Sequence, residues 1–364
     1  MLTATQRARL VRAWREGLPA PWDTLLAGAA FAYRGALALR WAAYASGILR
    51  TRSLPCRVLA VGNLTVGGTG KTPLVELVAR TLGGRGRRVV IVSRGYGRRR
   101  PDRVGLVSDG HRLLLTAREA GDEPYLLARR VPGVPVVVGR DRFRAGAVAL
   151  PRFQPDVLLL DDGFQQMRLR KDAEVVCLDA RAPWGHRGLL PRGSLREPLA
   201  ALRRAHFLVL THAAACAEPA RLEGELRAYA PTAPIAHAHY EAEAVEDLRS
   251  GTLSPADTLR GRPLLAFAGI AVPENFRATL AELGVVPRDF VAFPDHHAYT
   301  VADVRALEAR AHVAGAETLV TTEKDAVRLA ASGTMPVWVL RVRLSLRDED
   351  ATWWAALDAR LALP

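Results

Sequence analysis

The sequence is poor in cysteine, lysine and aromatic residues. Its three cysteines, Cys56, Cys177 and Cys216, are far apart and form no C-x-x-C pair. This spacing argues against a disulfide framework and a zinc ribbon, and it favours a reducing compartment. Only 6% of the residues are aromatic, and many of these lie in the N-terminal segment. A nucleic-acid-binding module would interleave aromatic residues with its basic clusters, so we expect no nucleic-acid partner.

Long hydrophobic runs are absent as well. No uncharged apolar stretch reaches the roughly 18–20 residues that a membrane-spanning helix needs. The first 20 residues contain arginines but lack the apolar core of a secretory signal. The sequence therefore predicts a chain that neither crosses a membrane nor carries a secretion signal.

Basic residues are in clear excess. Lys and Arg together number 51 against 37 Asp and Glu, which gives a net charge of +14. This charge favours an anionic partner: nucleic acid, a phosphorylated substrate or acidic lipid head groups. Apolar residues are 49% and charged residues 24% of the chain, as in soluble globular proteins. A length of 364 residues indicates two domains.

Residues 21–50 have the pattern of an amphipathic helix. At helical spacing one face collects apolar and aromatic side chains, namely Leu26, Ala30, Tyr33, Leu37, Trp41, Tyr44 and Ile48, and the run is interrupted by Arg34, Arg40 and Arg50. Interfacial aromatics and scattered arginines are typical of a helix that lies in the plane of a membrane surface. The alternative is a stripe that packs on the chain's own domain.

The rest of the chain alternates short β-branched runs with helical stretches. Strands are predicted at 57–61, 88–92, 134–138, 157–160, 174–178 and 207–210, with helices at 73–82, 123–130 and 143–150 among them. A second alternating set has strands at 264–267, 289–293, 318–321 and 337–342. This order predicts an α/β fold with a mostly parallel sheet flanked by helices. We expect an N-terminal helical segment (1–50), a P-loop domain (51–200) and a smaller second α/β domain (201–364).

A phosphate-binding loop follows the first predicted strand. Its residues are Thr65, Val66, Gly67, Gly68, Thr69, Gly70, Lys71 and Thr72. In a Walker A loop, glycine backbone N–H groups surround phosphates, a Lys reaches the β- and γ-phosphates and a Ser or Thr hydroxyl binds Mg²⁺. Thr65 departs from the general pattern, which has Gly five positions before Gly70. We expect Gly67 and Gly68 to supply the permissive backbone instead.

The scarcity of lysine strengthens this assignment. The chain has three lysines, Lys71, Lys171 and Lys324, against 48 arginines. A chain that uses arginine almost everywhere still places lysine at the phosphate position, where a compact ammonium fits and a planar guanidinium does not.

Two adjacent carboxylates end the strand predicted at 157–160. P-loop enzymes need an acidic residue at the tip of a neighbouring strand to hold Mg²⁺ or its waters. Asp161 and Asp162 occupy that position. Because adjacent side chains at a strand tip point in different directions, we expect the two to differ in role.

Eight strings in order identify a family. They are TVGGTGKTP (65–73), SRGYGR (93–98), GDEP (121–124), VGRDR (138–142), DDGFQ (161–165), GLLPRGSLREP (188–198), FPDHH (293–297) and TTEKD (321–325). Together they resemble the tetraacyldisaccharide 4′-kinases, the lipid A kinases of Gram-negative bacteria, over roughly residues 20 to 345. Any one string is weak, whereas eight in order, including the loop with Thr65, are highly specific.

The resemblance implies a reaction and a place. ATP would be the phosphoryl donor, with Mg²⁺, and a tetraacylated glucosamine disaccharide 1-phosphate the acceptor. Phosphorylation of its 4′-hydroxyl would give lipid IVA at the cytoplasmic face of the inner membrane. An acceptor whose acyl chains stay in the bilayer, together with the net charge of +14, favours the membrane-surface interpretation of residues 21–50 and an anionic membrane as partner.

The resemblance also implies the catalytic residues. Asp122, in the turn Gly-Asp-Glu-Pro, matches the family's catalytic aspartate and is our choice for general base. His296 matches the partner histidine, which would orient Asp122 or share its proton. His297 is the rival within the His-His pair. The alternatives without catalysis are a helix N-cap for Asp122 and a surface role for His296.

Further residues are candidates for holding nucleotide or substrate phosphates. These are Arg94, Tyr96, Arg98, Arg140, Arg142, Gln165, Arg196 and Glu197, with Glu197 also a candidate magnesium contact; Arg187 and Arg192 lie in the same long loop. Most of the 48 arginines must be merely solvated.

The rival class is a P-loop GTPase or metallochaperone NTPase. Guanine recognition requires Asn/Thr-Lys-x-Asp after a strand, and residues 322–325 lack the residue between Lys324 and Asp325. The sequence therefore favours the kinase.

Overall fold

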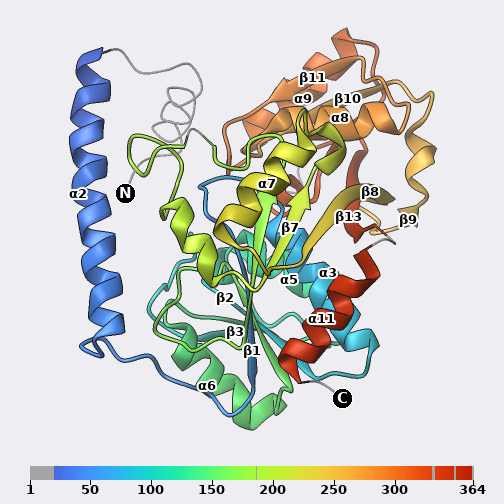
Figure 1. Cartoon of the computed structure of the whole chain (residues 1–364). Coiled ribbons are helices and arrows are strands. Elements are labelled where there is room, and N and C mark those ends of the chain that lie inside the picture. The colour runs from blue at the N-terminus through green and yellow to red at the C-terminus, as the bar shows by residue number, and fades with distance from the viewer. Residues whose placement is uncertain (1–19, 186, 330–332, 348–349, 363–364) are drawn as a thin grey trace. The chain divides into compact units, whose positions relative to one another are not determined.

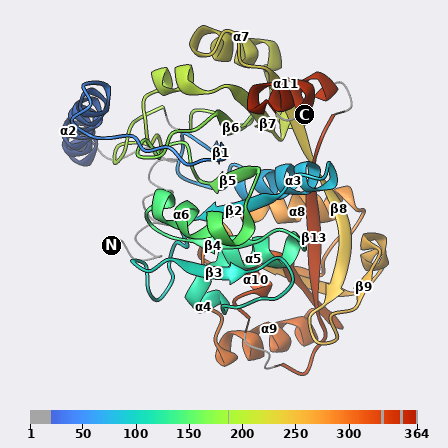
Figure 2. The same ribbon diagram turned by 90° about the horizontal axis from the view of Figure 1, so that it is seen from below.

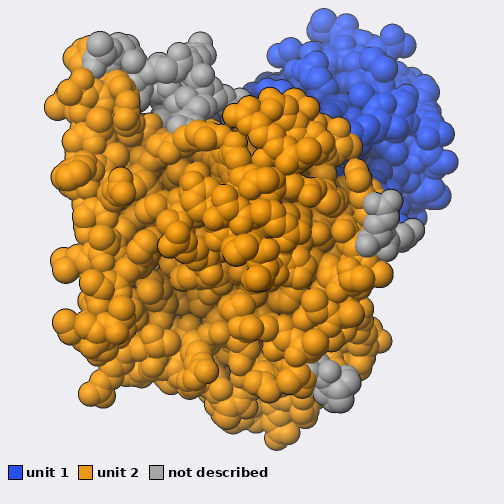
Figure 3. Space-filling view, in the orientation of Figure 1, with its two compact units in different colours: residues 1–10, 240–343 blue, residues 11–239, 344–364 orange. Residues whose placement is uncertain are grey.

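The computed structural model describes residues 20–185, 187–329, 333–347 and 350–362 (Figure 1). The chain divides into two compact units, coloured separately in Figure 3. The P-loop unit comprises residues 11–239 and 344–364, and the second unit is built mainly from residues 240–343. Two strands, β8 (Ile235–Asp247) and β13 (Val337–Leu346), carry the chain from one unit into the other.

The P-loop unit contains a mostly parallel sheet. Outward from β8, the strand order is β7 (Phe207–Thr211), β6 (Ala173–Asp179), β1 (Arg57–Gly62), β5 (Val157–Asp161), β2 (Val89–Ser93), β4 (Val136–Val138) and β3 (Gly105–Ser108). Among the described residues, these strands pair in parallel, except for β3, which is antiparallel to β4. The predicted α/β fold with a mostly parallel sheet is therefore confirmed.

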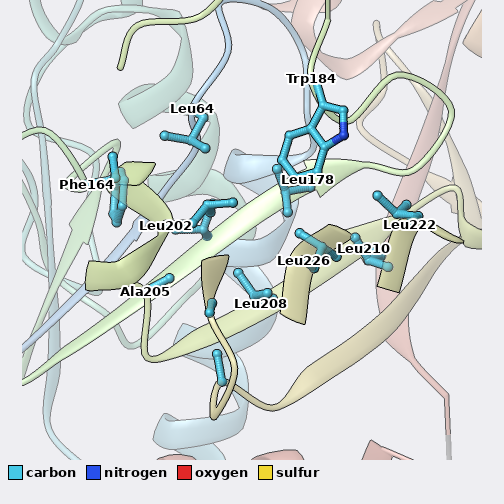
Figure 4. Packing of buried hydrophobic residues seen from close by; sticks show 14 of the residues in the cluster. Leu64, Phe164, Leu178, Trp184, Leu202, Ala205, Leu208, Leu210, Leu222 and Leu226 are labelled. Atoms are coloured by element: carbon cyan, nitrogen blue, oxygen red, sulfur yellow. The ribbon is translucent and has the colours of Figure 1, made fainter. Parts of the chain in front are cut away.

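Helices cover both faces of this sheet. One face is covered by α6 (Arg142–Phe153), the 3-10 helix η1 (Leu199–Arg204) and α7 (Pro219–Tyr229), and Figure 4 shows the core beneath η1 and α7. The other face carries α3 (Lys71–Gly84), α5 (Asp122–Arg130) and α11 (Ala351–Leu361). The connections change face at β1, because the chain moves from β1 toward β2 on one side and from β6 toward β8 on the other. Ligands of open α/β sheets bind at the carboxyl ends of strands beside such a switch point.

The second unit has its own sheet and two cores. Its strand order is β11 (Asp289–Ala292), β10 (Leu264–Ala268), β12 (Thr318–Thr322), β13 and β8, and β9 (Leu253–Ser254) pairs with β8 in antiparallel fashion. Alternate residues of β10 pack against α8 (Pro273–Glu282) on one face and α9 (Val301–Val313) on the other. A second α/β domain was predicted, and this unit is one.

The division between the units differs from the sequence-based boundary near residue 200. It falls at 239/240, and the chain returns to the P-loop unit at 343/344. The reason is pairing: β7 lies parallel to β6 over five residues, so residues 201–239 belong with the P-loop. All ten predicted strands are present. The 13-residue β8 was not predicted, because its alternating alanines and acids have low β-propensity.

Helix α2 (Ala20–Ala45) corrects the prediction for residues 21–50. Ala30 and Leu37 of the predicted membrane stripe are buried, and Tyr33 and Trp41 are half-buried against the P-loop unit. The stripe therefore packs on the chain's own domain. The opposite face is exposed, with Leu25, Phe31 and Leu39 each at least 65% accessible. Figure 2, in which α2 is seen nearly end-on, shows the helix at one edge of the P-loop unit. Among the described residues, no helix combines the length and apolar character needed to cross a bilayer.

Candidate functional site

The loop after β1 has Walker A geometry. Gly67 and Gly70 have φ angles of 127° and 90°, which only glycine adopts without strain. Lys71 and Thr72 are the first two residues of α3, so the unpaired N–H groups of the helix N-terminus lie behind the loop. Of the two glycines expected to supply the permissive backbone, Gly67 has a positive φ and Gly68 does not; Gly70 takes that place.

Thr65 replaces the usual glycine because the backbone at this position is extended. It forms an isolated bridge with Leu195, and the N–H of Val66 donates to the carbonyl of Ser194 at 2.8 Å. Asn63 braces the loop from inside, since its amide donates to the carbonyl of Thr65 at 2.7 Å and to Oγ1 of Thr69 at 3.0 Å. The loop is therefore held from the side by residues 194–195 rather than by a further glycine turn.

The far side of the loop is braced by two neighbouring strands. The carbonyl of Thr69 accepts hydrogen bonds from Sγ of Cys177 on β6 and Oγ1 of Thr211 on β7, at 2.8 and 3.1 Å. Neither residue, nor Asn63, was a candidate from the sequence. Their only signal was a position near the carboxyl end of a predicted strand.

Asp161 and Asp162 lie in different environments. Asp161 ends β5 and is buried, and Oγ of Ser93 donates to it at 2.7 Å. Asp162 adopts a left-handed φ of 53°. Both of its carboxylate oxygens accept hydrogen bonds from Nη1 of Arg196, at 2.8 and 2.9 Å. The ammonium of Lys71 lies 3.9 Å from its Oδ1. The phosphate-loop lysine, a carboxylate and Arg196 thus form one cluster.

These environments move the pKa values of the two acids in opposite directions. Burial and then the negative charge of Glu123 raise the pKa of Asp161 to about 6. Burial also disfavours the charged form of Asp162, but Lys71 and Arg196 outweigh it, and its pKa lies below the ordinary value. Burial lowers the pKa of Lys71, an effect that Asp162 opposes. Asp162 is therefore ionised at neutral pH, whereas the pKa of Asp161 lies about one unit below neutrality.

The Gly-Asp-Glu-Pro turn brings Glu123 close to this cluster. Gly121 has a φ of 92°, and a Cβ there would lie 2.8 Å from the carbonyl oxygen of Tyr96. This turn starts α5 at Asp122, which is half-buried. Glu123 interacts electrostatically with Lys71, Asp161 and Asp162. Sequence reasoning chose Asp122 and missed Glu123, whose signal was its place in the same string.

The arginine candidates divide into buried and exposed groups. Arg98 is buried and donates to the carbonyls of Pro101 at 2.8 Å and of Arg103. Arg142 is buried and donates to the carbonyl of Gly139 at 3.1 Å, and burial lowers its pKa to about 10. These two guanidiniums are hydrogen-bonded to backbone carbonyls inside the fold. By contrast, three candidates have exposed side chains, Arg94, Tyr96 and Arg140.

Three further candidates belong to one buried network. Glu197 is almost fully buried and pairs with Arg204 at 2.6 Å. Gln165 donates to the carbonyl of Asn63 at 2.9 Å, and its Oε1 accepts from Arg196 at 3.3 Å. The network therefore connects the loop 188–198 to the P-loop.

The histidine pair lies in the second unit, after β11. His297 is engaged there: its ring stacks on Phe293 with centroids 4.7 Å apart, and its Nε2 lies 3.2 Å from Asp303. His296 has a left-handed φ of 60°, its side chain is 38% exposed, and Asp295 is 3.9 Å away. A non-glycine residue in this conformation is uncommon and is found often at functional sites.

The string 321–325 has a structural role. Asp325 is fully buried and accepts from the N–H of Gly269 at 3.0 Å and from the hydroxyl of Tyr299 at 2.9 Å. Its other oxygen accepts from Thr322 at 2.6 Å. A carboxylate so fully bonded within the second unit is not presented to a guanine base, which agrees with rejecting the GTPase.

Donors for a divalent cation are present at the P-loop. Within the described ranges, no group of three or more His, Cys, Asp or Glu side chains has the arrangement of a metal site. The hydroxyl of Thr72 and the carboxylates of Asp161 and Asp162 are hard oxygen donors. Such donors suit Mg²⁺, which enters nucleotide sites with only one or two carboxylates and completes its shell with phosphates and water.

Comparison with known proteins agrees with this geometry. The sequence model of the family described as tetraacyldisaccharide-1-P 4′-kinase matches residues 22–362. A tetraacyldisaccharide 4′-kinase of Syntrophus aciditrophicus is 44% identical over 359 residues, covering 95% of this chain and 96% of that protein. One from Geobacter metallireducens is 47% identical over 305 residues, covering 84% and 88%.

A solved structure gives the same result. The crystal structure of LpxK from Aquifex aeolicus in complex with ATP superposes with a TM-score of 0.77 at 33% identity, covering 93% of this chain and 99% of that one. The P-loop cluster and the end-to-end similarity lead to one conclusion: this chain belongs to the tetraacyldisaccharide-1-phosphate 4′-kinase family.

Proposed function

We propose that the chain transfers the γ-phosphate of ATP to the 4′-hydroxyl of a tetraacylated disaccharide 1-phosphate, giving lipid IVA. The observation that carries this proposal is the cluster of Lys71, Asp162 and Arg196 at the start of α3. Two cations and a carboxylate meet there, at the helix N-terminus where we expect the γ-phosphate to bind. Phosphoryl transfer depends mostly on such positioning and charge stabilisation.

The P-loop residues would bind the nucleotide. Backbone N–H groups of residues 65–72 would face the phosphates, and Lys71 would reach the β- and γ-phosphates. Thr72, Asp161 and Asp162 would hold Mg²⁺, which when bound neutralises charge on the phosphates. Asp162 keeps Lys71 oriented in the absence of nucleotide. The exposed Arg94, Tyr96 and Arg140 are suited to contact phosphates of donor or acceptor.

Asp122 would take the proton of the attacking hydroxyl. Its position in the first turn of α5, next to Glu123, supports this role, because Glu123 interacts with Lys71 and Asp161. His296 would orient Asp122 or share its proton. The engagement of His297 by Phe293 and Asp303 favours His296 as the partner.

The exposed face of α2 would bind the membrane surface. It presents Leu25, Phe31 and Leu39, and its remaining positions are mainly alanine and glycine. Arg34 and Arg50 are exposed near it, and the chain carries a net charge of +14. An apolar face with flanking arginines is typical of a helix lying in an anionic interface. We therefore place the protein peripherally at the cytoplasmic face of the inner membrane.

The test is a transfer assay with radiolabelled ATP. Detergent-solubilised tetraacyldisaccharide 1-phosphate should accept label at the 4′-position in the presence of Mg²⁺, and chelation should stop the reaction. RNA and DNA serve as control stimulants of ATP consumption. ATP hydrolysis that is stimulated by nucleic acid, with no labelled lipid, would overturn the proposal.

A further inference from the structure

The inner face of α2 contacts the residues that hold the phosphate-loop cluster. The hydroxyl of Tyr33 donates to the backbone carbonyl of Arg196 at 2.8 Å. The indole Nε1 of Trp41 donates to Oε1 of Glu197 at 3.3 Å. Two aromatic donors, two helical turns apart, thus bond to two consecutive residues of the loop 188–198.

Glu197 requires hydrogen-bond donors because it is buried. Its side chain is 2% exposed, and it accepts from Arg204, Gln165 and Trp41. A buried carboxylate is stable only when its oxygens are paired. The guanidinium of Arg204 lies over the rings of Phe164 and Trp41, at 4.5 and 5.6 Å from their centroids. Trp41 therefore supports Glu197 directly and through Arg204.

Arg196 connects α2 to the P-loop through its backbone and its side chain. Its carbonyl is fixed by Tyr33, its backbone N–H donates to the carbonyl of Leu64 at 2.7 Å, and its guanidinium bonds Asp162. Asp162 in turn lies 3.9 Å from the ammonium of Lys71. A continuous series of contacts therefore runs from α2 to the lysine of the phosphate loop.

We propose that Tyr33 and Trp41 are positioning residues for phosphoryl transfer, which act by holding Arg196 and Glu197 against the P-loop. This inference rests on the proposed kinase function and assigns to α2 a second task besides membrane binding. The two tasks belong to opposite faces of the helix. A displacement of about 1 Å at a reacting centre can lower the reaction rate strongly. A change on the inner face of α2 that shifts Arg196 should therefore lower the rate even without a membrane.

The test removes one donor atom at a time. Tyr33→Phe deletes the hydroxyl, and Trp41→Phe deletes the indole N–H while keeping an aromatic ring. The matched controls are Tyr229→Phe and Trp354→Phe, half-buried residues of the same unit whose polar atoms make no hydrogen bond to the part of the chain that the structure describes. Transfer is measured with detergent-solubilised acceptor, and kcat is divided by the number of ATP sites titrated by calorimetry, so that unfolded protein does not count.

We expect each test variant to lose about tenfold in kcat, the effect of one hydrogen bond to a charged or positioning group. KM for ATP should stay close to that of the controls. In a double-mutant cycle, Trp41→Phe should add little to the loss caused by Glu197→Gln, because both act on one contact.

Three results would overturn this inference. Test variants with the kcat of the controls would show that α2 does not position the site. Losses that multiply in the cycle would show that Trp41 does not act through Glu197. A loss seen only on vesicles would make Trp41 a membrane residue. If the unmodified chain phosphorylates no acceptor, the proposed function falls as well, whereas failure of vesicle binding alone leaves this inference intact.

Discussion

At the scale of single residues, Lys71 carries the strongest expectation. Lys71→Ala should lower transfer by at least about 10²-fold, because a charge-stabilising group is lost from the transition state. The fold should survive, since this ammonium lies beside Asp162 at the start of α3 and is not part of the hydrophobic core. Lys71→Arg should also be poor, because a planar guanidinium does not fit the loop. Transfer assays paired with thermal melts check this, and activity within a few-fold of wild type would refute the P-loop assignment.

Asp122 and His296 should behave as one catalytic unit. General-base catalysis contributes about 10²–10⁴-fold, so each single alanine variant should lose mainly kcat and keep ATP affinity. Residues that serve one step are non-additive, and the double variant should be hardly worse than the worse single one. A double-mutant cycle on kcat, with nucleotide binding measured separately, decides the matter. Losses that multiply would place His296 in another role, such as a contact to a substrate phosphate.

Asp161 makes the protein less stable when it ionises. Its pKa is raised in the folded state to about 6, above the value of about 3.9 in unfolded chains. The folded state therefore binds this proton more tightly, and the associated stability is present below about pH 4 and is lost as pH rises through 6. In metal-free protein, Asp161→Asn should raise the free energy of unfolding at pH 8 by up to about 3 kcal/mol and by much less at pH 4. Denaturant titrations at both pH values measure this, and equal gains at the two would contradict it.

Individual residues also show how far the sequence could locate the site. The positions of Lys71, Asp161 and Asp162 were predictable from local sequence patterns. Lys71 stands in a glycine-rich loop, and the two acids directly follow an apolar strand. Asn63, Thr211 and Glu123 were not, because their roles depend on which strands become neighbours and on how a turn is aimed. Arg98 and Arg142 were candidates as phosphate ligands, yet backbone carbonyls engage them inside the fold. In a sequence with 48 arginines, no local pattern distinguishes the buried Arg98 and Arg142 from the exposed Arg94 and Arg140.

At the scale of elements, α2 was predicted as a helix but its membrane face was misassigned. Apolar side chains occupy both its faces, so periodicity alone could not choose between them. The aromatic residues Tyr33 and Trp41 suggested an interface, but their polar atoms bond to Arg196 and Glu197 within the protein. The strands were predictable because buried parallel strands are β-branched runs; β8 lacks this character and was missed.

The corrected face of α2 gives a vesicle-binding prediction. Replacing Phe31 and Leu39 together by Glu should move the protein from the vesicle pellet to the supernatant, since each buried apolar side chain contributes about 1.5–3 kcal/mol. Val148→Glu, an exposed change on α6, is the control. Activity on detergent-solubilised acceptor should fall less than vesicle binding. Unchanged pelleting of the double variant would exclude this face as the membrane contact.

Helix α11 should be essential to the stability of the P-loop unit. Trp353 is 1% exposed, and its ring lies 5.3 Å from that of Phe207 on β7. Trp353→Ala should lower the free energy of unfolding by about 3–5 kcal/mol. Trp354 is only half-buried, so Trp354→Ala should lower it by less. Denaturant titration compares the two variants. Equal costs would mean that this core relaxes around the missing indole.

At the scale of the whole molecule, the P-loop unit is discontinuous in sequence. Residues 240–343 lie between β7 and the return of the chain along β13 to α11. During synthesis, a ribosome therefore releases the phosphate loop, both carboxylates and seven strands well before the helix that covers Phe207. Until then Phe207 lacks the indole of Trp353 that covers it, so we expect the core of the P-loop unit to be completed only after the second unit has been synthesised. The order of translation thus delays the completion of this core until α11 has emerged.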